Sequence, residues 1–334
     1  MFRFIVRRLL QVIPTLLGLS VLLFVWLRAL PGGPEAAALG PRPTPEALEA
    51  ARARLGLDEP LWVQYGRYMR RLLNGDLGTS TVTNRPVLDE FLLRIPATIE
   101  LAFAAMAIAI AVGIPVGYFA ARRRGRLLDG LTLSGSMLGI CTPVFFLAFL
   151  LKWVFGVNLG WFPVSGRQSS GMNATHITNF FVLDGILTGE WDAAWDAAIH
   201  LVLPAVAVAS IPFAIIVRMT RASVLEVLGE DYVRTAEAKG LTTKVVRRRH
   251  VLRNALLPVV TVVGVLTGAL LSGAVLTETV FTINGIGRYL YLAIQTQDYP
   301  VLMAFILIIA LIFVIINMLV DISYSIIDPR VRVR

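Results

Sequence analysis

The chain has 334 residues, of which 56% are hydrophobic and only 16% are charged. Soluble globular domains carry about a quarter charged residues, so this composition excludes a soluble protein and indicates a membrane protein. The formal net charge of +9 would suit a nucleic-acid partner, but the basic residues are segregated by loop. Such segregation is a signal of membrane topology, and no nucleic acid is expected.

The first predicted element is an apolar run over residues 9–30, which follows three arginines at positions 3, 7 and 8. The run is longer than the apolar core of a signal peptide, and Pro-Gly-Gly-Pro at 31–34 is a poor cleavage site. Residues 1–30 are therefore expected to form a cytoplasmic N-terminal end and a retained transmembrane helix.

The next segment, 31–95, is expected to be a small ordered extracytoplasmic unit. It holds eight basic and eight acidic residues and is neutral on balance. Thr44 and Pro45 are typical of a helix start and Gly56 of a helix end. The aromatic-rich stretch 61–68 is the nearest surface on which that helix can pack.

Five further apolar runs are long enough to cross a membrane, which takes about 20 residues in a helix. With the first run they predict an all-α fold with six transmembrane helices. Small residues in steps of four, as at Gly113 and Gly117 or at Gly135 and Gly139, favour close helix packing. Prolines such as Pro143 are expected to kink or end helices. The five runs cover residues 97–121, 130–156, 199–221, 255–277 and 301–327.

The loops alternate in charge along the chain. Basic residues cluster before the first run, at 122–126, within 218–254, which holds nine, and at the C-terminus. The loops 157–197 and 278–299 hold one arginine each against six acidic residues together. With six spans all basic clusters fall on one side, so both termini are expected in the cytoplasm, with 328–334 as a cytoplasmic tail.

Polar residues inside or beside the spans give weaker signals. Arg28, Glu100 and Lys152 lie near the predicted external ends, where long side chains are expected to reach the membrane interface. Side chains that line a solute route are expected at the polar positions of the fifth span and just after it, which are Thr267, Ser272, Thr277 and Glu278.

The stretch 218–258 between the fourth and fifth spans predicts a short capped helix. Gly229 breaks the preceding helix, Asp231 is a suitable N-cap, and Gly240 ends a helix over 232–239. A rod of about 12 Å is too short to be stable alone, and with Ala236 and Ala238 it suits a groove on another protein. A basic solvated connector is the plain alternative, but it would not need these glycines, cap and alanines.

A second helix is expected after Gly240, capped by Thr242 or Thr243. Its arginines at 247–249 would meet headgroups or acidic partners, while Val245, Val246 and Leu252 would face the bilayer.

The stretch 218–258 resembles the EAA-type loop of ABC importer permeases, in the dipeptide/oligopeptide/nickel branch. The resemblance extends over the chain and includes RRLLQVIPTLLG, LPGGP, GLDEPLWVQYGRYMRRLLNGDLG, LTETVFTINGIGR and DYP. The N-terminal motifs are similar to the first, B-type, permease of dipeptide transporters. Arg234-Thr235-Ala236 stands in place of Glu-Ala-Ala and the Leu-Pro pair comes late, as is usual in this branch, whereas Gly33 replaces an expected acidic residue.

The resemblance implies an ABC type I importer transmembrane domain over residues 96–327, with five core helices and a coupling loop at 222–254. It implies four kinds of partner: a second homologous permease, two ATP-binding subunits, an extracytoplasmic solute-binding protein and membrane lipid. The residues expected to couple to the ATP-binding subunit are Gly229, Glu230, Asp231, Tyr232, Val233, Arg234, Thr235, Ala236, Gly240 and Leu241.

The chain is not expected to be an enzyme. The sequence has no Gly-x4-Gly-Lys-Ser/Thr phosphate loop, so ATP and magnesium are expected on partner subunits, and no metal or other cofactor is expected on this chain. The expected function is import of peptides, in the first place dipeptides, across the cytoplasmic (inner) membrane by alternating access. A nickel-chelate or glutathione importer is the near alternative. An ATP-independent carrier would predict paired acids deep in the spans and inverted repeats, and the sequence has neither.

Overall fold

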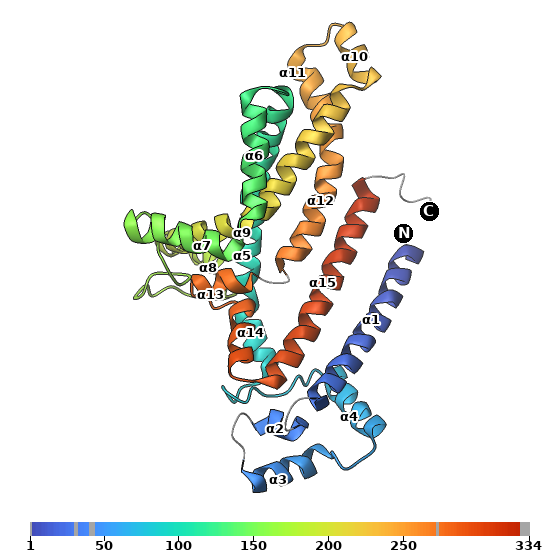
Figure 1. The fold of residues 1–334 in the computed structure, drawn as a ribbon, viewed down its shortest axis with the longest axis vertical. Coiled ribbons are helices and arrows are strands. Elements are labelled where there is room, and N and C mark those ends of the chain that lie inside the picture. The colour runs from blue at the N-terminus through green and yellow to red at the C-terminus, as the bar shows by residue number, and fades with distance from the viewer. Residues whose placement is uncertain (1, 30–32, 40–43, 272–273, 328–334) are drawn as a thin grey trace.

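The computed structural model describes residues 2–29, 33–39, 44–271 and 274–327. These residues are mainly helical and contain no strand beyond one isolated bridge between Thr79 and Pro86, which confirms the predicted all-α class. The molecule is elongated, with α10 and α11 at one end and α2 to α4 at the other (Figure 1). The helices are α1 (Phe2–Ala29), α2 (Gly33–Leu39), α3 (Pro45–Leu55), α4 (Leu61–Leu73), α5 (Val87–Arg122), α6 (Leu127–Cys141), α7 (Val144–Leu151), the π-helix η1 (Lys152–Asn158), α8 (Phe181–Thr188), α9 (Trp191–Leu228), α10 (Asp231–Ala238), α11 (Thr243–Val245), the π-helix η2 (Val246–Leu252), α12 (Arg253–Leu271), α13 (Val275–Val280), α14 (Ile286–Gln295) and α15 (Tyr299–Ile327).

Within the described ranges, five helical stretches are long and apolar enough to cross a membrane, and they match the first, second, fourth, fifth and sixth predicted spans. The third predicted span is a pair of helices bent by 103°, so the count of six holds when this pair is one span. The five stretches are Gln11–Ala29, Val87–Arg122, Trp191–Leu228, Thr243–Leu270 and Tyr299–Met318.

The bend between α6 and α7 follows from Pro143. A proline has no N–H to donate and disfavours the helical conformation of the residue before it, so α6 ends at Cys141. α6 runs alongside α5 and α9, whereas α7 lies across them (Figure 1). The prediction that Pro143 kinks or ends a helix is confirmed, and the span predicted over 130–156 consists of two helices bent at this proline.

The helices α5 and α9 pack along most of their length and form the centre of the fold. Alanines such as Ala105, Ala109 and Ala207 are completely buried between them. A Cβ atom at Gly117 would lie 2.6 Å from the carbonyl oxygen of Val217, so only glycine permits this approach. Close packing is thereby confirmed for the second span. Gly135 on α6 faces open space instead.

The described residues between α1 and α5 include three helices, of which α3 is bounded as predicted. The hydroxyl of Thr44 accepts a hydrogen bond from the backbone N–H of Ala47 (3.3 Å), and Gly56 ends the helix with φ of +64°. α3 packs mainly on α2, however, and not on the 61–68 stretch. That stretch belongs to α4, whose Tyr68 packs with α1 and α15.

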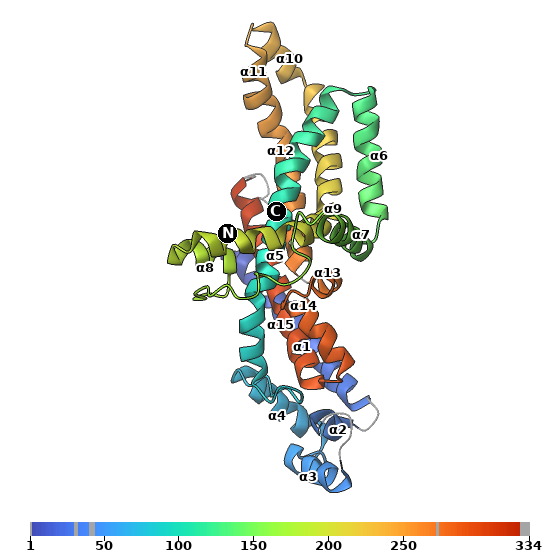
Figure 2. The same ribbon diagram turned by 90° about the vertical axis from the view of Figure 1, so that its left-hand side faces the viewer.

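The long helix α5 links the two ends of the molecule. It begins at Val87, directly after Pro86, and continues without a break to Arg122. Figure 2 shows it running from the level of α4 to the level of the turn into α6. The helix therefore includes the last nine residues of the predicted extracytoplasmic segment 31–95. Asp89 and Glu90 lie in its first turn, where the helix dipole favours acidic side chains.

Candidate functional site

The 222–254 loop connects α9 with α12 and contains α10, α11 and η2. It forms the end of the molecule opposite α2 to α4 (Figure 1). Most side chains from Leu228 to Val245 are exposed, whereas the buried Val233 and Ala236 belong to a cluster with residues of α5, α9 and α12. The loop is thus both accessible and attached to the body of the fold.

The helix α10 begins one residue earlier than predicted. Glu230 occupies the N-cap position with an extended backbone and makes no side-chain cap bond, and Asp231 is the first helical residue. The prediction that Asp231 is the N-cap is therefore wrong, although an acidic side chain in the first turn suits the helix dipole. The predicted end is confirmed: Gly240 has φ of +76°, and the N–H of Leu241 bonds to the carbonyl oxygen of Ala236 (3.3 Å).

One face of α10 is buried against its own chain. Val233 and Ala236 are 2% and 5% exposed and pack with Val246, Val251 and Ala255 from η2 and α12. The expectation that Ala236 enters a groove on another protein is wrong for this structure, because η2 already covers it. The small side chain instead lets α10 lie close to η2.

The opposite face of α10 is exposed and mixes apolar with charged side chains. Tyr232 is 40% exposed and its hydroxyl accepts a hydrogen bond from the side-chain amide of Asn254 (3.0 Å). Arg234, Thr235, Glu237, Ala238 and Lys239 are exposed beside it. Exposed large apolar side chains rimmed by charge are typical of surfaces that bind another protein. Those in this segment are Leu228, Tyr232, Leu241 and Val245.

The segment after Gly240 differs from the predicted amphipathic helix. Thr242 occupies an N-cap position as expected, but α11 has three residues and the chain continues as a π-helix. Val246 is 2% exposed and packs under α10, so it does not face the bilayer. Arg248 and Arg249 remain exposed.

An ion pair fixes the turn between α5 and α6 to α9 beside this loop. The guanidinium of Arg221 donates two hydrogen bonds to Asp129 (2.5 and 2.8 Å), and Asp129 also accepts from the N–H of Gly125 (2.9 Å). The Asp129 side chain is 6% exposed. Two parallel bonds give such a pair a fixed geometry. The sequence carried one signal for it, a lone acid just after the arginines at 122–126.

The predicted route residues do not lie on one span. Thr267 is on α12, where its hydroxyl bonds to the carbonyl oxygen of Val263 (2.8 Å). Ser272 lies outside the described residues. α12 ends at Leu271, so the predicted span 255–277 is too long: Thr277 and Glu278 belong to the separate helix α13 and are both buried.

Glu278 is held by hydrogen bonds within the chain. Its carboxylate accepts from the hydroxyl of Thr98 (2.6 Å) and from the N–H of Arg288 (2.9 Å), and the side chain is completely buried. The Arg288 N–H lies in the first turn of α14, so Glu278 supplies the cap that Gly285 cannot. We call Thr98, Glu278 and the first turn of α14 the Glu278 clamp.

The charged residues near the ends of the spans also bond within the chain. Arg28 bonds to Gln64, Lys152 donates to the carbonyl oxygen of Val280 (2.7 Å), and Glu100 pairs with Arg167 (2.7 Å). These side chains join segments that are distant in the sequence. That they also reach the membrane interface stays a prediction.

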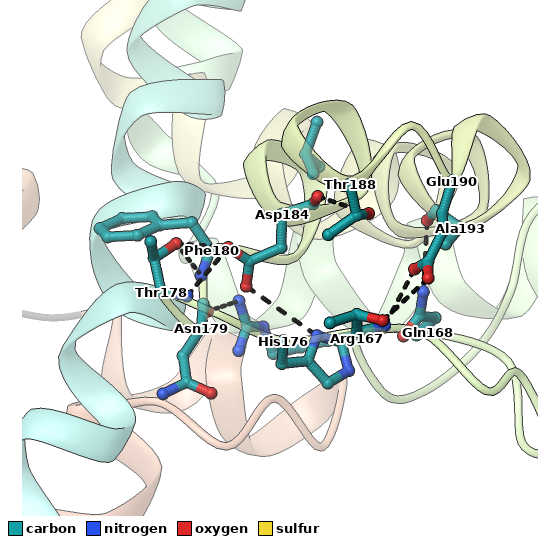
Figure 3. Close-up of polar contacts among 12 residues, drawn as sticks. Arg167, Gln168, His176, Thr178, Asn179, Phe180, Asp184, Thr188, Glu190 and Ala193 are labelled. Atoms are coloured by element: carbon teal, nitrogen blue, oxygen red, sulfur yellow. Dashed lines mark hydrogen bonds and ion pairs between the residues drawn. The ribbon is translucent and has the colours of Figure 1, made fainter.

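A loop after η1 is ordered by a buried aspartate on α8. Asp184 accepts from both the N–H and the hydroxyl of Thr178 (2.9 and 2.6 Å), with His176 close by (Figure 3). Burial alone would raise the pKa of Asp184, but hydrogen bonds from Thr178 and the neighbouring backbone lower the pKa below its ordinary value. The loop is thereby fixed on α8 in the carboxylate form.

Two family models together match most of the chain. The model described as "Binding-protein-dependent transport system inner membrane component" matches residues 113–333, and that of its N-terminal part matches residues 1–102. The chain belongs to this family. It is therefore a multi-pass inner-membrane component of a transport system that works with a solute-binding protein, and the resemblance to ABC importer permeases is confirmed.

Individual relatives cover the whole length. The dipeptide transport system permease protein DppB of Alkalihalophilus pseudofirmus is 46% identical over 99% of this chain and 100% of its own length. DppB of Escherichia coli K12 is 45% identical over 99% of both chains. The glutathione transport system permease protein GsiC of E. coli O6:H1 is 39% identical, again over 99% of both.

Proposed function

We propose that this chain is the first permease subunit of an ATP-driven importer of dipeptides. One observation carries the proposal: relatives named as dipeptide permeases are 45–46% identical over nearly the full length, whereas the glutathione permease is 39% identical over a similar length. We therefore assign dipeptides, rather than glutathione, as the cargo of this chain. The test must also distinguish dipeptides from nickel chelates as the cargo.

The proposal places an ATP-binding subunit on the exposed face of α10, around Tyr232 and Leu241. Two features of the loop support this. Large apolar side chains stay exposed there beside charged ones, while Val233 and Ala236 on the other face are buried. The buried face of α10 contacts η2 and α12, and the ion pair Asp129–Arg221 joins α6 to α9. A displacement of α10 would therefore also displace the long helices.

The complete transporter then contains this chain, a second permease, two ATP-binding subunits that hold ATP and magnesium, and the solute-binding protein. Closure of the ATP-binding pair moves both α10 helices and alternates access across the membrane. In this proposal the 222–254 loop and both chain ends lie on the cytoplasmic side, which the clusters of arginine at 122–126 and 247–249 support.

In this proposal, the solute passes beside α12 near Thr267. Thr277 and Glu278 are buried in this conformation, so they would meet the solute only after α13 moves. Ser272 is kept as a route residue on its position in the sequence alone.

The test is uptake of a labelled dipeptide by cells that lack this chain. We expect uptake to fall to background in these cells, to return with a gene copy, and to stop when ATP is depleted. Excess unlabelled dipeptide should compete, whereas glutathione and nickel–histidine should not. Restored uptake of glutathione or nickel without dipeptide uptake would contradict the cargo, and uptake that persists without ATP would contradict the importer itself.

A further inference from the structure

A cavity of about 310 Å³ lies between the turn at 79–86, the first part of α5 and the helix α14. It is far from the 222–254 loop, because α14 lies toward the opposite end of the molecule (Figure 1). Its volume is at the small end of the range of ~300–1,000 Å³ found for ligand pockets. The lining residues that carry the argument are Val82, Thr83, Asn284, Arg288, Tyr289 and Leu292.

Arg288 brings to the cavity a positive charge that has no carboxylate partner among the described residues. Among the ion pairs of the described residues none includes Arg288, whose guanidinium donates only to the side-chain oxygen of Asn284 (2.5 Å). That bond fixes the Asn284 amide so that its NH₂ group stays available as a donor. The remaining guanidinium N–H groups and this amide form a donor set that suits a carboxylate.

The other charged groups of the cavity, Arg94 and Asp298, bond to groups other than Arg288. Arg94 pairs with Glu90 and stacks on the ring of Tyr289, with 3.9 Å from guanidinium carbon to ring centroid. Asp298 is 2% exposed and accepts from the hydroxyl of Ser80 (2.5 Å) and from nearby backbone N–H groups. Neither the carboxylate of Glu90 nor that of Asp298 bonds to Arg288, so the guanidinium of Arg288 remains available to a bound anion.

Backbone strain is concentrated around the same cavity. In the described residues, four non-glycine positions have a left-handed backbone, and three of them, Asn84, Thr282 and Gln297, lie within two residues of a lining residue. For a β-branched residue such as Thr282 this conformation is unusual and unfavourable. Phe281 and Ile283, each 1% exposed, anchor the strained turn on both sides. Strain of this kind clusters at ligand-binding sites.

We propose that this cavity binds the free C-terminal carboxylate of the transported dipeptide, with Arg288 and Asn284 as the donors. The ring of Tyr289 and the apolar side chains of Val82 and Leu292 contact the side chains of the peptide. The Glu278 clamp holds the backbone of Arg288, which fixes the base of that side chain. This assignment rests on the proposed function and adds the group by which this chain recognises its cargo.

The test uses the complete transporter in nanodiscs and a dipeptide of alanine and benzoylphenylalanine as a photoreactive probe. We expect labelling within 79–86 or 284–296, and we expect dialanine to compete at least about tenfold better than dialanine amide, since a charge-assisted bidentate contact is lost in the amide. Arg288→Gln should lower labelling by a similar factor and Arg288→Lys by less. Arg70→Gln, at an exposed arginine of α4, is the matched control and should change nothing.

Three results would overturn the site, and a fourth would overturn the proposed function. In the first, the amide competes as well as the acid. In the second, Arg288→Gln leaves labelling unchanged but weakens association with the solute-binding protein, which would assign the guanidinium to an acidic side chain of that protein. Intact dipeptide uptake without labelling would overturn the site alone. Failure of the wild-type transporter to take up dipeptide in proteoliposomes would overturn the proposed function.

Discussion

The 222–254 loop and the Glu278 clamp both contain short helices beside the spans, but their contacts differ. The helix α10 packs on residues close in sequence, such as Val246 and Val251, and leaves its other face exposed. Glu278 is completely buried and bonds to Thr98, which lies 180 residues away. A segment that keeps large apolar side chains exposed is suited to a partner, whereas one whose polar groups are all satisfied stabilises its own fold.

The largest effect should come from the clamp. Glu278→Ala leaves the Thr98 hydroxyl and the N–H of Arg288 without an acceptor, and it should lower the free energy of unfolding by about 3 kcal/mol or more. The control is Glu237→Ala on the exposed face of α10, which should have little effect. Thermal unfolding of the purified chain in detergent measures both. Equal midpoints for the two variants would remove the distinction between the segments.

The second-largest effect is expected at the ion pair beside the loop, Asp129–Arg221. Arg221→Ala leaves the nearly buried carboxylate of Asp129 without its bidentate partner and should cost about 2 kcal/mol. Solute taken up per ATP hydrolysed should fall as well, because α6 is no longer tied to α9. The exchanged pair, Asp129→Arg with Arg221→Asp, should recover part of the stability. A double variant that loses the sum of the two single losses would show that the contact itself contributes nothing.

The two faces of α10 separate packing from docking. Ala236→Leu overfills the contact with η2 and should destabilise the chain by about 1–3 kcal/mol. Ala238→Leu, two residues away and exposed, should leave unfolding unchanged but reduce co-purification of the ATP-binding subunit. The opposite pattern, with unfolding changed only by Ala238→Leu, would reverse the assignment of the faces.

The smallest effect is expected at the end of α10. Gly240 has φ of +76°, so Gly240→Ala should cost about 1 kcal/mol. Gly229→Ala is the matched control, because Gly229 has φ of −82°, which alanine adopts freely. Unfolding midpoints of the two variants give the comparison. A larger loss at Gly229 would mean that backbone conformation does not explain either glycine.

The local features of the loop were predictable from sequence. Gly229, Gly240 and Thr242 act within a few residues of their positions, so the bounds of α10 were right to within one residue. The orientation of α10 was not predictable in this way. An eight-residue helix with alanines at two positions does not reveal which alanine its own chain will cover, and η2 covers Ala236.

Contacts between distant segments account for the other differences. A polar residue after an apolar run looked like a route residue, but Glu278 is used by Thr98 and α14, which the pattern around 278 does not indicate. The bend at Pro143 did carry a signal. The length and hydropathy of residues 130–156 suggested one span. Only the tertiary structure shows that the chain turns across α9 at the proline.

Site-specific photocrosslinking tests the central assignment most directly. A photoreactive amino acid at position 232, in place of Tyr232, should form an adduct with the ATP-binding subunit in native membranes. The same amino acid at Trp62, which is 76% exposed on α4 at the opposite end, should form none with that subunit. An adduct with the ATP-binding subunit from position 62, or from neither position, would contradict docking on the 222–254 loop.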